Sequence, residues 1–216
     1  MKKLEKIIDY FDRLFPEPAC ALDFAFAYEL LVAVILSAQC TDKRVNIVTK
    51  DLFKLASTPQ QMLNLGIDKL KTIIYPCGFY NAKSKAIIET SEDIIKKFNG
   101  EVPSSLEDLT TLRGVGRKTA NVVIANAFSG QTIAVDTHVH RISKRLDLTS
   151  ENSSPYQCEM DLLKIVPKDS RSKFHHQMIQ FGRNICKAIK PNCDICELKD
   201  ICKYYKIKSQ TNNKRK

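Results

Sequence analysis

The sequence lacks an apolar run long enough to cross a bilayer. Its most apolar stretch, LLVAVILSA at residues 30–38, is far shorter than the roughly 20 residues that a membrane-spanning helix needs. The amino terminus begins basic, but Glu5, Asp9 and Asp12 interrupt any signal-like apolar region. We therefore expect an intracellular protein of the cytoplasm, without a signal peptide and without a membrane partner.

Internal repeats, a Gly/Ser-rich linker and a second strand-like run are also missing. The stretch QTIAVDT at residues 131–137 favours a β-strand, but no further run of this kind alternates with helices. An α/β sheet is therefore not expected. Because no linker divides the chain, only its motifs indicate where a domain boundary lies.

Helical signals recur along the chain instead. The apolar residues between positions 4 and 15 follow a helical period, and residues 81–98 read as one long helix that Asn99 and Gly100 close. Three patterns are typical of capped helix starts: residues 58–61, 104–107 and 154–157. The sequence predicts an all-α protein. The polar, basic tail at residues 209–216 is expected to lack ordered structure.

The charge balance favours a polyanionic partner. Lys and Arg outnumber Asp and Glu by 34 to 24, which gives a formal net charge of +10. A surplus of this size is typical of proteins that bind nucleic acid, although a lysine-rich composition alone would produce it as well. Hydrophobic residues make up 44% of the chain, which is enough for a folded core.

Four of the eight cysteines stand close together near the end of the sequence. They have the spacing C-x6-C-x2-C-x5-C, and charged residues fill the intervals, so this segment is not an apolar core strand. Four thiolates within so short a span can converge on one metal centre. Zinc and an iron–sulfur cluster both take four cysteines, and ligand type does not separate them. The four are Cys186, Cys193, Cys196 and Cys202.

A lysine follows a glycine-flanked turn at TLRGVGRKTANVV, residues 111–123. Gly114 and Gly116 permit a tight turn between two helices, and the amides of such a turn bind phosphate without reading sequence. Lys118 then lies in the first turn of the next helix, opposite its main apolar face. It is either a solvated lysine or a nucleophile, because the positive end of a helix and partial burial both lower the pKa of an amine.

A carboxylate follows at AVDTHVHR, residues 134–141. Asp136 is expected to cap the next helix. Since a capping carboxylate is held rigidly, the same group could also face Lys118 across a cleft. His138 and His140 either bind phosphate or stabilise this segment.

These motifs together resemble the endonuclease III family of DNA repair glycosylases. The resemblance rests on LRGVGRKTANVV, AVDTHVHR and the cysteine spacing in this order, and also on LLVAVILSAQCTDKRVN and GFYNAKSKAI. It extends from about Phe24 to Cys202. The combination is highly specific, whereas each motif alone is not.

The resemblance implies an all-α helix–hairpin–helix fold with two helical lobes. One lobe would span residues 20–130, with the helix–hairpin–helix motif at about 106–126. Residues 1–19 and 131–208 would form the other lobe, and the four cysteines would there hold one [4Fe–4S] cluster per chain. The implied partner is damaged double-stranded DNA, bound by a monomer that associates with the nucleoid.

The resemblance also implies a mechanism. The target base is flipped out of the stack, Lys118 attacks C1′ to form a Schiff base, and β-elimination then breaks the strand. Asp136 would stabilise the developing charge on the sugar and act in proton transfer. The DNA contacts implied by motif position or by loop charge are Gln39, Phe79, Arg113, Gly114, Val115, Gly116, Lys187 and Lys190.

Two residues depart from the family pattern. Arg113 replaces the proline that is usual in the hairpin, where arginine could add a phosphate contact. Phe79 stands where a leucine wedge is usual.

Two other classes of protein share some of these features. An adenine-mismatch glycosylase has the cluster and the hairpin, but it lacks the lysine and carries a further domain. A non-catalytic cluster- or zinc-bearing DNA-binding module would explain the charge and the cysteines, but gives no reason for Lys118 and Asp136 together.

Overall fold

The computed structural model describes residues 2–213, and every regular element in that range is a helix. The all-α prediction is confirmed. No helix within these residues is both long and apolar enough to span a membrane.

The prediction for the tail is wrong over residues 209–213, because helix α12 spans Lys203–Asn213. The amide of Lys206 donates to the carbonyl of Cys202 at 3.1 Å, and the Ser209 hydroxyl donates back to the carbonyl of Lys206 at 2.9 Å. The backbone ladder started at Lys203 therefore extends into the polar segment. Residues 214–216 lie outside the described residues.

The chain divides into two compact units. We call Cys20–Gly130 the hairpin unit, and Met1–Ala19 together with Gln131–Lys216 the cysteine unit.

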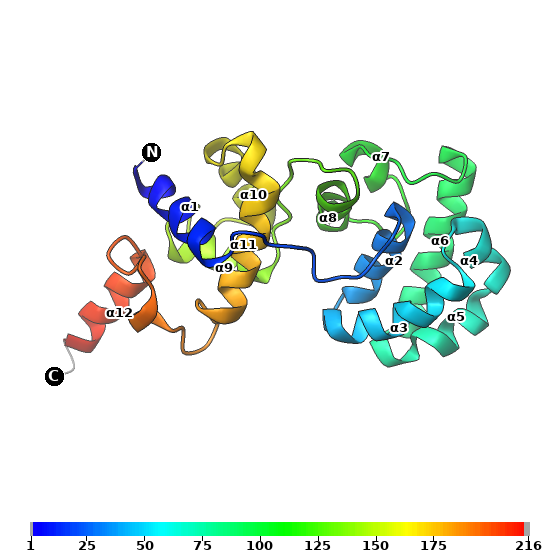
Figure 1. Cartoon of the computed structure of the whole chain (residues 1–216), viewed down its shortest axis with the longest axis horizontal. Helices are drawn as coiled ribbons and strands as arrows, with labels where there is room; N and C mark the ends of the chain where they lie inside the picture. Colours follow the sequence, from blue (N-terminus) through cyan, green and yellow to red (C-terminus); the bar gives the residue numbers. More distant parts are fainter. Residues whose placement is uncertain (1, 214–216) are drawn as a thin grey trace. The chain divides into compact units, whose positions relative to one another are not determined.

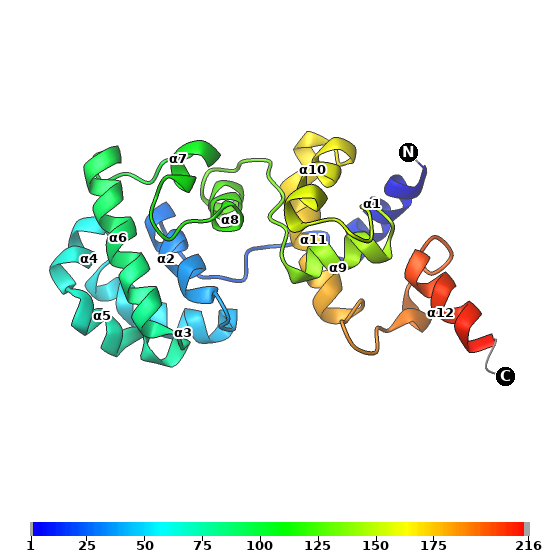
Figure 2. The same cartoon turned by 180° about the vertical axis from the view of Figure 1, so that it is seen from behind.

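The hairpin unit contains seven α-helices and one 3-10 turn among its described residues. They are α2 (Ala27–Ser37), α3 (Asp42–Leu55), α4 (Pro59–Leu65), α5 (Ile67–Ile74), η1 (Tyr75–Cys77), α6 (Tyr80–Phe98), α7 (Leu106–Thr110) and α8 (Arg117–Ala127). Helices α4 and α5 pack along the long helix α6 in both views (Figures 1 and 2).

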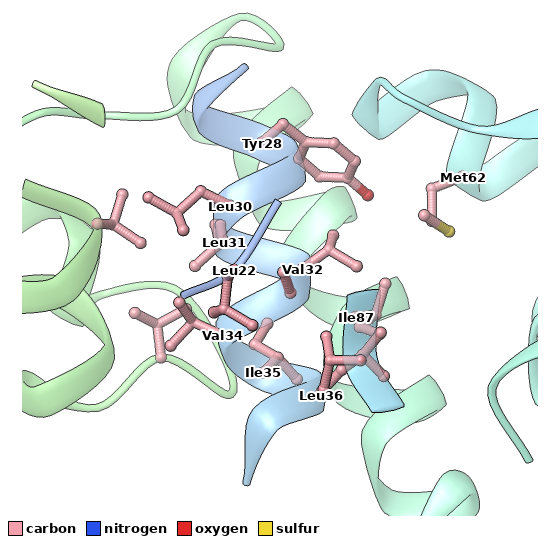
Figure 3. Packing of buried hydrophobic residues seen from close by; sticks show 14 of the residues in the cluster. Leu22, Tyr28, Leu30, Leu31, Val32, Val34, Ile35, Leu36, Met62 and Ile87 are labelled. Atoms are coloured by element: carbon pink, nitrogen blue, oxygen red, sulfur yellow. The ribbon is translucent and has the colours of Figure 1, made fainter. Parts of the chain in front are cut away.

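Helix α2 forms the centre of this unit. It is apolar on all sides, which is typical of a helix with no face toward water, and all residues from Tyr28 to Leu36 are buried. Its side chains leave the helix in several directions, toward Met62 of α4 and Ile87 of α6 among others (Figure 3). Helices α3, α6 and α8 all pack against α2, so the hairpin that precedes α8 is attached to the core.

The cysteine unit contains α1 (Lys2–Leu14), α9 (Thr137–Arg145), α10 (Pro155–Ile165), η2 (Lys168–Ser170), α11 (Arg171–Asn184), η3 (Cys193–Ile195) and α12. Helix α11 packs on both α1 and α9. The rings of Phe11, Phe174 and Phe181 meet in its core, with Phe11 5.7 Å from Phe174 and 5.0 Å from Phe181 between ring centroids. The amino-terminal helix is therefore tied to residues more than 160 positions away in the sequence.

Two of the three predicted helix starts are confirmed and the third is displaced by one residue. Thr58 and Ser154 accept hydrogen bonds from the amides of Gln61 and Gln157 at 3.3 Å and 3.1 Å. In the third case Ser105, not Ser104, is the N-cap, because α7 begins at Leu106 and the amide of Asp108 donates to the Ser105 hydroxyl.

Candidate functional site

A tight turn joins α7 to α8 and forms the hairpin. The amide of Val115 donates to the carbonyl of Leu112 at 3.1 Å, and Gly114 has φ +84°. This is the geometry of a type II turn, which requires a positive φ at its third residue. A Cβ added at Gly114 would lie 2.9 Å from the Cβ of Ala86 in α6. Glycine is therefore required here both by the backbone angle and by the close approach of α6.

The turn leaves the start of α8 without a side-chain cap, because its N-cap is Gly116. Amides at such an uncapped helix start can donate to an anion. The amide of Val115 is used inside the turn, and this residue is only 6% exposed in the core. The backbone of Val115 thus shapes the hairpin, and its contact with DNA stays a prediction.

Arg113 points its guanidinium at helix α6. Its Nε lies 3.0 Å from Asp93 Oδ2, and one terminal nitrogen donates to Glu92 Oε2 at 3.0 Å. The other terminal nitrogen lies 3.6 Å from Glu89 Oε1. The hydrogen bond from Arg113 holds the pKa of the Glu92 carboxyl below its usual range. The positive charge expected to meet a phosphate is thus engaged by three carboxylates.

Lys118 is the second residue of α8 and is exposed. The opposite side of the helix, with Ala120, Val123 and Ile124, is buried against the core. Lys118 is exposed, as predicted, but Asn121 and Ala125, which follow it on the same side of α8, are buried, so the helix is covered on both sides beyond its first turn. The ammonium group of the exposed Lys118 is accessible to a ligand that binds at the hairpin.

Gln39 and Phe79 share an unusual backbone conformation. Both have a positive φ, 53° and 49° respectively, although neither is glycine. Gln39 is exposed, and the Phe79 side chain is 65% exposed despite its size. Non-glycine residues in this region carry strain that is common at functional sites. Two exposed, strained loops of the hairpin unit thus present an amide and an aromatic ring to solvent.

Asp136 caps α9 in the cysteine unit, as the sequence predicted. Its Oδ1 accepts the amide of Val139 at 2.8 Å, and the side chain is half-buried. One carboxylate oxygen is thereby held in place by the backbone of its own unit.

A polar cluster follows on the same helix. Arg141 donates to His138 Nδ1 at 3.2 Å, to the carbonyl of Gly182 at 3.1 Å and to that of Cys186 at 2.9 Å. Burial lowers the pKa of His138, against the opposing effect of Asp136. A Cβ at Gly182 would lie 2.6 Å from His138 Nδ1. Sequence reasoning missed this cluster, since nothing local connects residues about 40 positions apart.

The four cysteines of the C-x6-C-x2-C-x5-C motif line a single pocket in the cysteine unit. The pocket opens to solvent and is otherwise bounded by residues that include Leu146, Phe181, Pro191 and Tyr204. The described residues contain no group of three or more His, Cys, Asp or Glu side chains with the spacing of a metal-ion site.

The thiols in this pocket influence one another. Burial, with smaller contributions from the proximity of Cys186, Cys202 and Cys193, raises the pKa of Cys196 to about 11. Burial likewise raises the pKa of Cys193 and of Cys202. Thiolates so close together are unfavourable without a cation, and bound metal makes a coordinating thiol lose its proton. By ligand type, four cysteine thiols around one pocket are the donors that zinc and iron–sulfur centres take, although the described arrangement is not that of a bound metal ion.

Arg145 holds the beginning of this segment. It donates to Cys186 Sγ at 3.3 Å, to the carbonyl of Lys187 at 2.7 Å and to that of Ala188 at 2.9 Å. Its guanidinium lies 4.2 Å from the ring centroid of Tyr204, and its own carbonyl accepts from Cys202 Sγ at 3.4 Å. Sequence reasoning did not single out Arg145, although a cation in the last turn of a helix is a weak signal for such a role.

Lys187 and Lys190 lie on the loop between the first two cysteines, and both are exposed. The loop is short and pinned, since the amides of Lys187 and Asn192 both donate to the carbonyl of Ile185. Lys190 has φ +50°. The ammonium groups are thus carried on a segment of defined conformation.

The candidate residues fall into two groups. Gln39, Phe79, the hairpin and Lys118 belong to the hairpin unit. Asp136, the four cysteines and the two loop lysines belong to the cysteine unit.

Comparison with known proteins identifies the class. Residues 32–168 match the HhH-GPD superfamily of base excision DNA repair proteins. Endonuclease III of Haemophilus influenzae is 48% identical over 189 residues, covering 88% of this chain and 89% of the relative. Endonuclease III of Bacillus subtilis is 44% identical over 203 residues, covering 94% and 93%. The chain is therefore a base-excision repair protein of the helix–hairpin–helix class.

Comparison with solved structures narrows the class to a family. A trapped covalent endonuclease III–DNA intermediate aligns with a TM-score of 0.92 at 43% identity, covering 96% of this chain and 98% of that one. A non-covalent endonuclease III–DNA complex aligns equally well, at 42% identity. The protein belongs to the endonuclease III family, and it is a bifunctional enzyme, a DNA glycosylase and abasic-site lyase.

Proposed function

We propose that this protein removes oxidised pyrimidines from damaged double-stranded DNA through Lys118, and that it then nicks the abasic strand by β-elimination. The observation that carries the proposal is the match over nearly the whole chain to an endonuclease III trapped covalently on DNA. A covalent intermediate requires a nucleophile, and Lys118 is an exposed amine at the helix start after the hairpin.

Lys118 would act through its neutral amine. The nitrogen bonds to C1′ of the flipped nucleotide, and the C1′–base bond breaks as the base leaves with a proton. Opening of the sugar ring gives a Schiff base between the lysine nitrogen and C1′. The iminium withdraws electrons, so a C2′ proton is lost and the C3′–O bond breaks, releasing the 3′ phosphate. Water then hydrolyses the imine and frees the lysine.

Asp136 would supply negative charge as the sugar becomes positive, and would move a proton during ring opening. The hydrogen bond from the Val139 amide fixes one oxygen and leaves the other for this work. A rigid carboxylate needs no reorganisation during the reaction. A carboxylate that is already fixed as a helix cap is therefore well suited to this role.

The hairpin would hold a DNA phosphate at the amides of Gly114 and Gly116 and at the start of α8. Gln39 would enter the gap left by the flipped base, and Phe79 would insert its ring as an apolar wedge. The exposure and the positive φ of both residues support these roles. Lys187 and Lys190 would add contacts to the DNA backbone.

We further propose one [4Fe–4S] cluster per chain, held by Cys186, Cys193, Cys196 and Cys202. When bound, it would supply four iron–thiolate bonds that tie residues 186–202 into one rigid segment. The convergence of four mutually perturbed thiols in one pocket supports this assignment. The base-excision reaction has no net redox step, so we assign the cysteines a structural role. We also propose a monomer that works in the nucleoid.

The test is borohydride trapping on a duplex with one oxidised pyrimidine. Reduction of the Schiff base should give a stable protein–DNA adduct, and Lys118→Gln should bind the duplex yet form none. Lys50→Gln, which changes an exposed lysine on α3, is the matched control and should trap normally. Adduct formation by the Lys118→Gln variant at normal yield would remove Lys118 from the role.

A second duplex with a preformed abasic site separates the alternatives. A lyase leaves a β-elimination nick on it, whereas an adenine-mismatch glycosylase without the lysine and a DNA-binding module leave it intact. A protein that neither traps nor nicks would contradict the proposed mechanism.

A further inference from the structure

Arg113 occupies the turn position where proline is commonly found. The turn runs from Leu112 to Val115, so Arg113 is its second residue, and proline at that position stiffens a type II turn. Arginine gives no such restriction of the backbone. In this chain the turn has to be held by contacts instead.

The contacts come from α6 and reach both the side chain and the backbone of Arg113. Asp93 Oδ2 accepts from the backbone amide at 2.9 Å and from Nε at 3.0 Å. The Thr90 hydroxyl donates to the carbonyl of Arg113 at 2.5 Å. One residue of the turn thus has its amide, its carbonyl and its side chain all bound to one helix.

The partners on α6 are buried. Asp93 has a side chain only 6% exposed, and Thr90 is 1% exposed. Burial alone would raise the pKa of Asp93, but the hydrogen bonds from Arg113 and Lys97 leave that pKa below its usual value. Lys97 also donates to the carbonyl of Thr111 at 3.2 Å, just before the turn. The carboxylate is therefore ionised and shared between two cations that flank the hairpin.

We propose that Arg113 is a positioning residue, which anchors the DNA-gripping hairpin to α6 through Asp93 and Thr90 and does not itself bind phosphate. The proposal rests on the proposed role of the hairpin amides. An anchored turn presents its amides in one conformation, so that binding DNA does not have to order them. Glu92 and Glu89 complete the anchor by holding the outer edge of the guanidinium.

The alternative, a phosphate contact by Arg113, predicts different behaviour. Loss of a phosphate contact makes the slope of log affinity against log salt shallower by about 0.9. Loss of an anchor weakens binding without removing a charge from the interface, so the slope stays near its original value. Lysine can contact a phosphate as a point charge, but it cannot reproduce the fork of an arginine.

The experiment compares Arg113→Met and Arg113→Lys with the double variant Arg113→Pro/Asp93→Leu in the whole protein. In the double variant, proline at position 113 stiffens the turn, and leucine at position 93 replaces the ionic contact by an apolar one. Because Asp93 is replaced as well, no buried carboxylate is left without its arginine. The measurements are affinity for an abasic duplex at several salt concentrations, amide hydrogen exchange at residues 114–116 without DNA, and KM and kcat.

We expect Arg113→Met and Arg113→Lys to bind about two- to tenfold more weakly, with an unchanged salt slope and faster exchange at the hairpin. KM should rise and kcat should change little, because Lys118 is untouched. The double variant should recover both slow exchange and affinity without any arginine.

Three results would overturn the proposal: wild-type binding by Arg113→Met, normal binding by Arg113→Lys, or a salt slope of Arg113→Met that is shallower than the wild-type slope by about 0.9. Failure of the proposed function itself would appear separately, as wild-type protein that does not bind or nick the duplex.

Discussion

Asp136 Oδ1 lies 2.8 Å from the backbone nitrogen of Val139, so the proposed catalytic carboxylate is also the N-cap of α9. Substitutions at this residue can separate the two roles. Asparagine keeps an oxygen for the cap but removes the charge, whereas alanine removes both.

We predict that Asp136→Asn folds with near-normal stability and loses most of its turnover on an oxidised pyrimidine. Asp136→Ala should lose turnover to a similar extent, and its free energy of unfolding should fall by about 1 kcal/mol because the cap is gone. Denaturant unfolding and single-turnover kinetics measure the two effects independently. If Asp136→Asn kept a near wild-type rate, the carboxylate would serve only as the cap of α9 and would have no catalytic role.

Gly114 is predicted to tolerate no side chain. Its φ of +84° is unfavourable for other residues, and a Cβ would lie 2.9 Å from that of Ala86. Gly114→Ala should therefore cost about 1–3 kcal/mol of stability or displace the hairpin from α6. Gly116, where a Cβ meets nothing within 4 Å, is the control position. Gly116→Ala should leave the melting temperature nearly unchanged, and equal destabilisation by both changes would contradict the explanation.

The sequence identified those features of the site that depend on local chemistry. Lys118 as an exposed residue at a helix start, Ser154 and Thr58 as N-caps, and Asp136 as a cap all follow from patterns within a few residues. The anchor of Arg113 could not be predicted in this way, because Asp93 lies 20 positions earlier and the hydrogen bonds depend on how the turn packs on α6. Arg113 was instead expected to face a phosphate.

In the cysteine unit, too, contacts between residues distant in the sequence could not be predicted from local patterns. The spacing of the four cysteines predicted a common centre; all four line one pocket, and the metal centre itself stays a prediction. The spacing gave no indication that Arg145 bonds to Cys186 and to the loop carbonyls, or that Arg141 joins Gly182 to His138. These contacts connect α9 to residues about 40 positions later, and only the packing of α9 on α11 brings them together.

The cysteine pocket is predicted to contain iron and sulfide. Protein purified anaerobically should be brown and contain about four irons per chain. Cys202→Ser should lose iron and fold poorly, because the segment from 186 to 202 would no longer be tied together. Cys20→Ser, which changes a half-buried cysteine in the hairpin unit, should keep its iron. Elemental analysis that finds zinc in place of iron would reverse the assignment.

Lys187 and Lys190 lie on the loop between the first two cysteines of the motif. The loop is pinned by Arg145, which donates to the carbonyls of Lys187 and Ala188 at 2.7 Å and 2.9 Å. A pinned loop can present ammonium groups to a DNA backbone with little loss of conformational freedom. Phosphate contacts carry little sequence information, and they are screened by salt.

Changing both lysines to alanine should therefore weaken binding to damaged and undamaged duplexes alike. Because two phosphates would no longer be neutralised, the slope of log affinity against log salt should become shallower by about two units. The nick rate at saturating enzyme should stay unchanged, because neither residue touches the reacting atoms. Lys50→Ala, on α3 of the other unit, removes one positive charge and serves as the control. If neither affinity nor slope moves relative to that control, the two lysines are solvated and the loop serves the cysteine pocket alone.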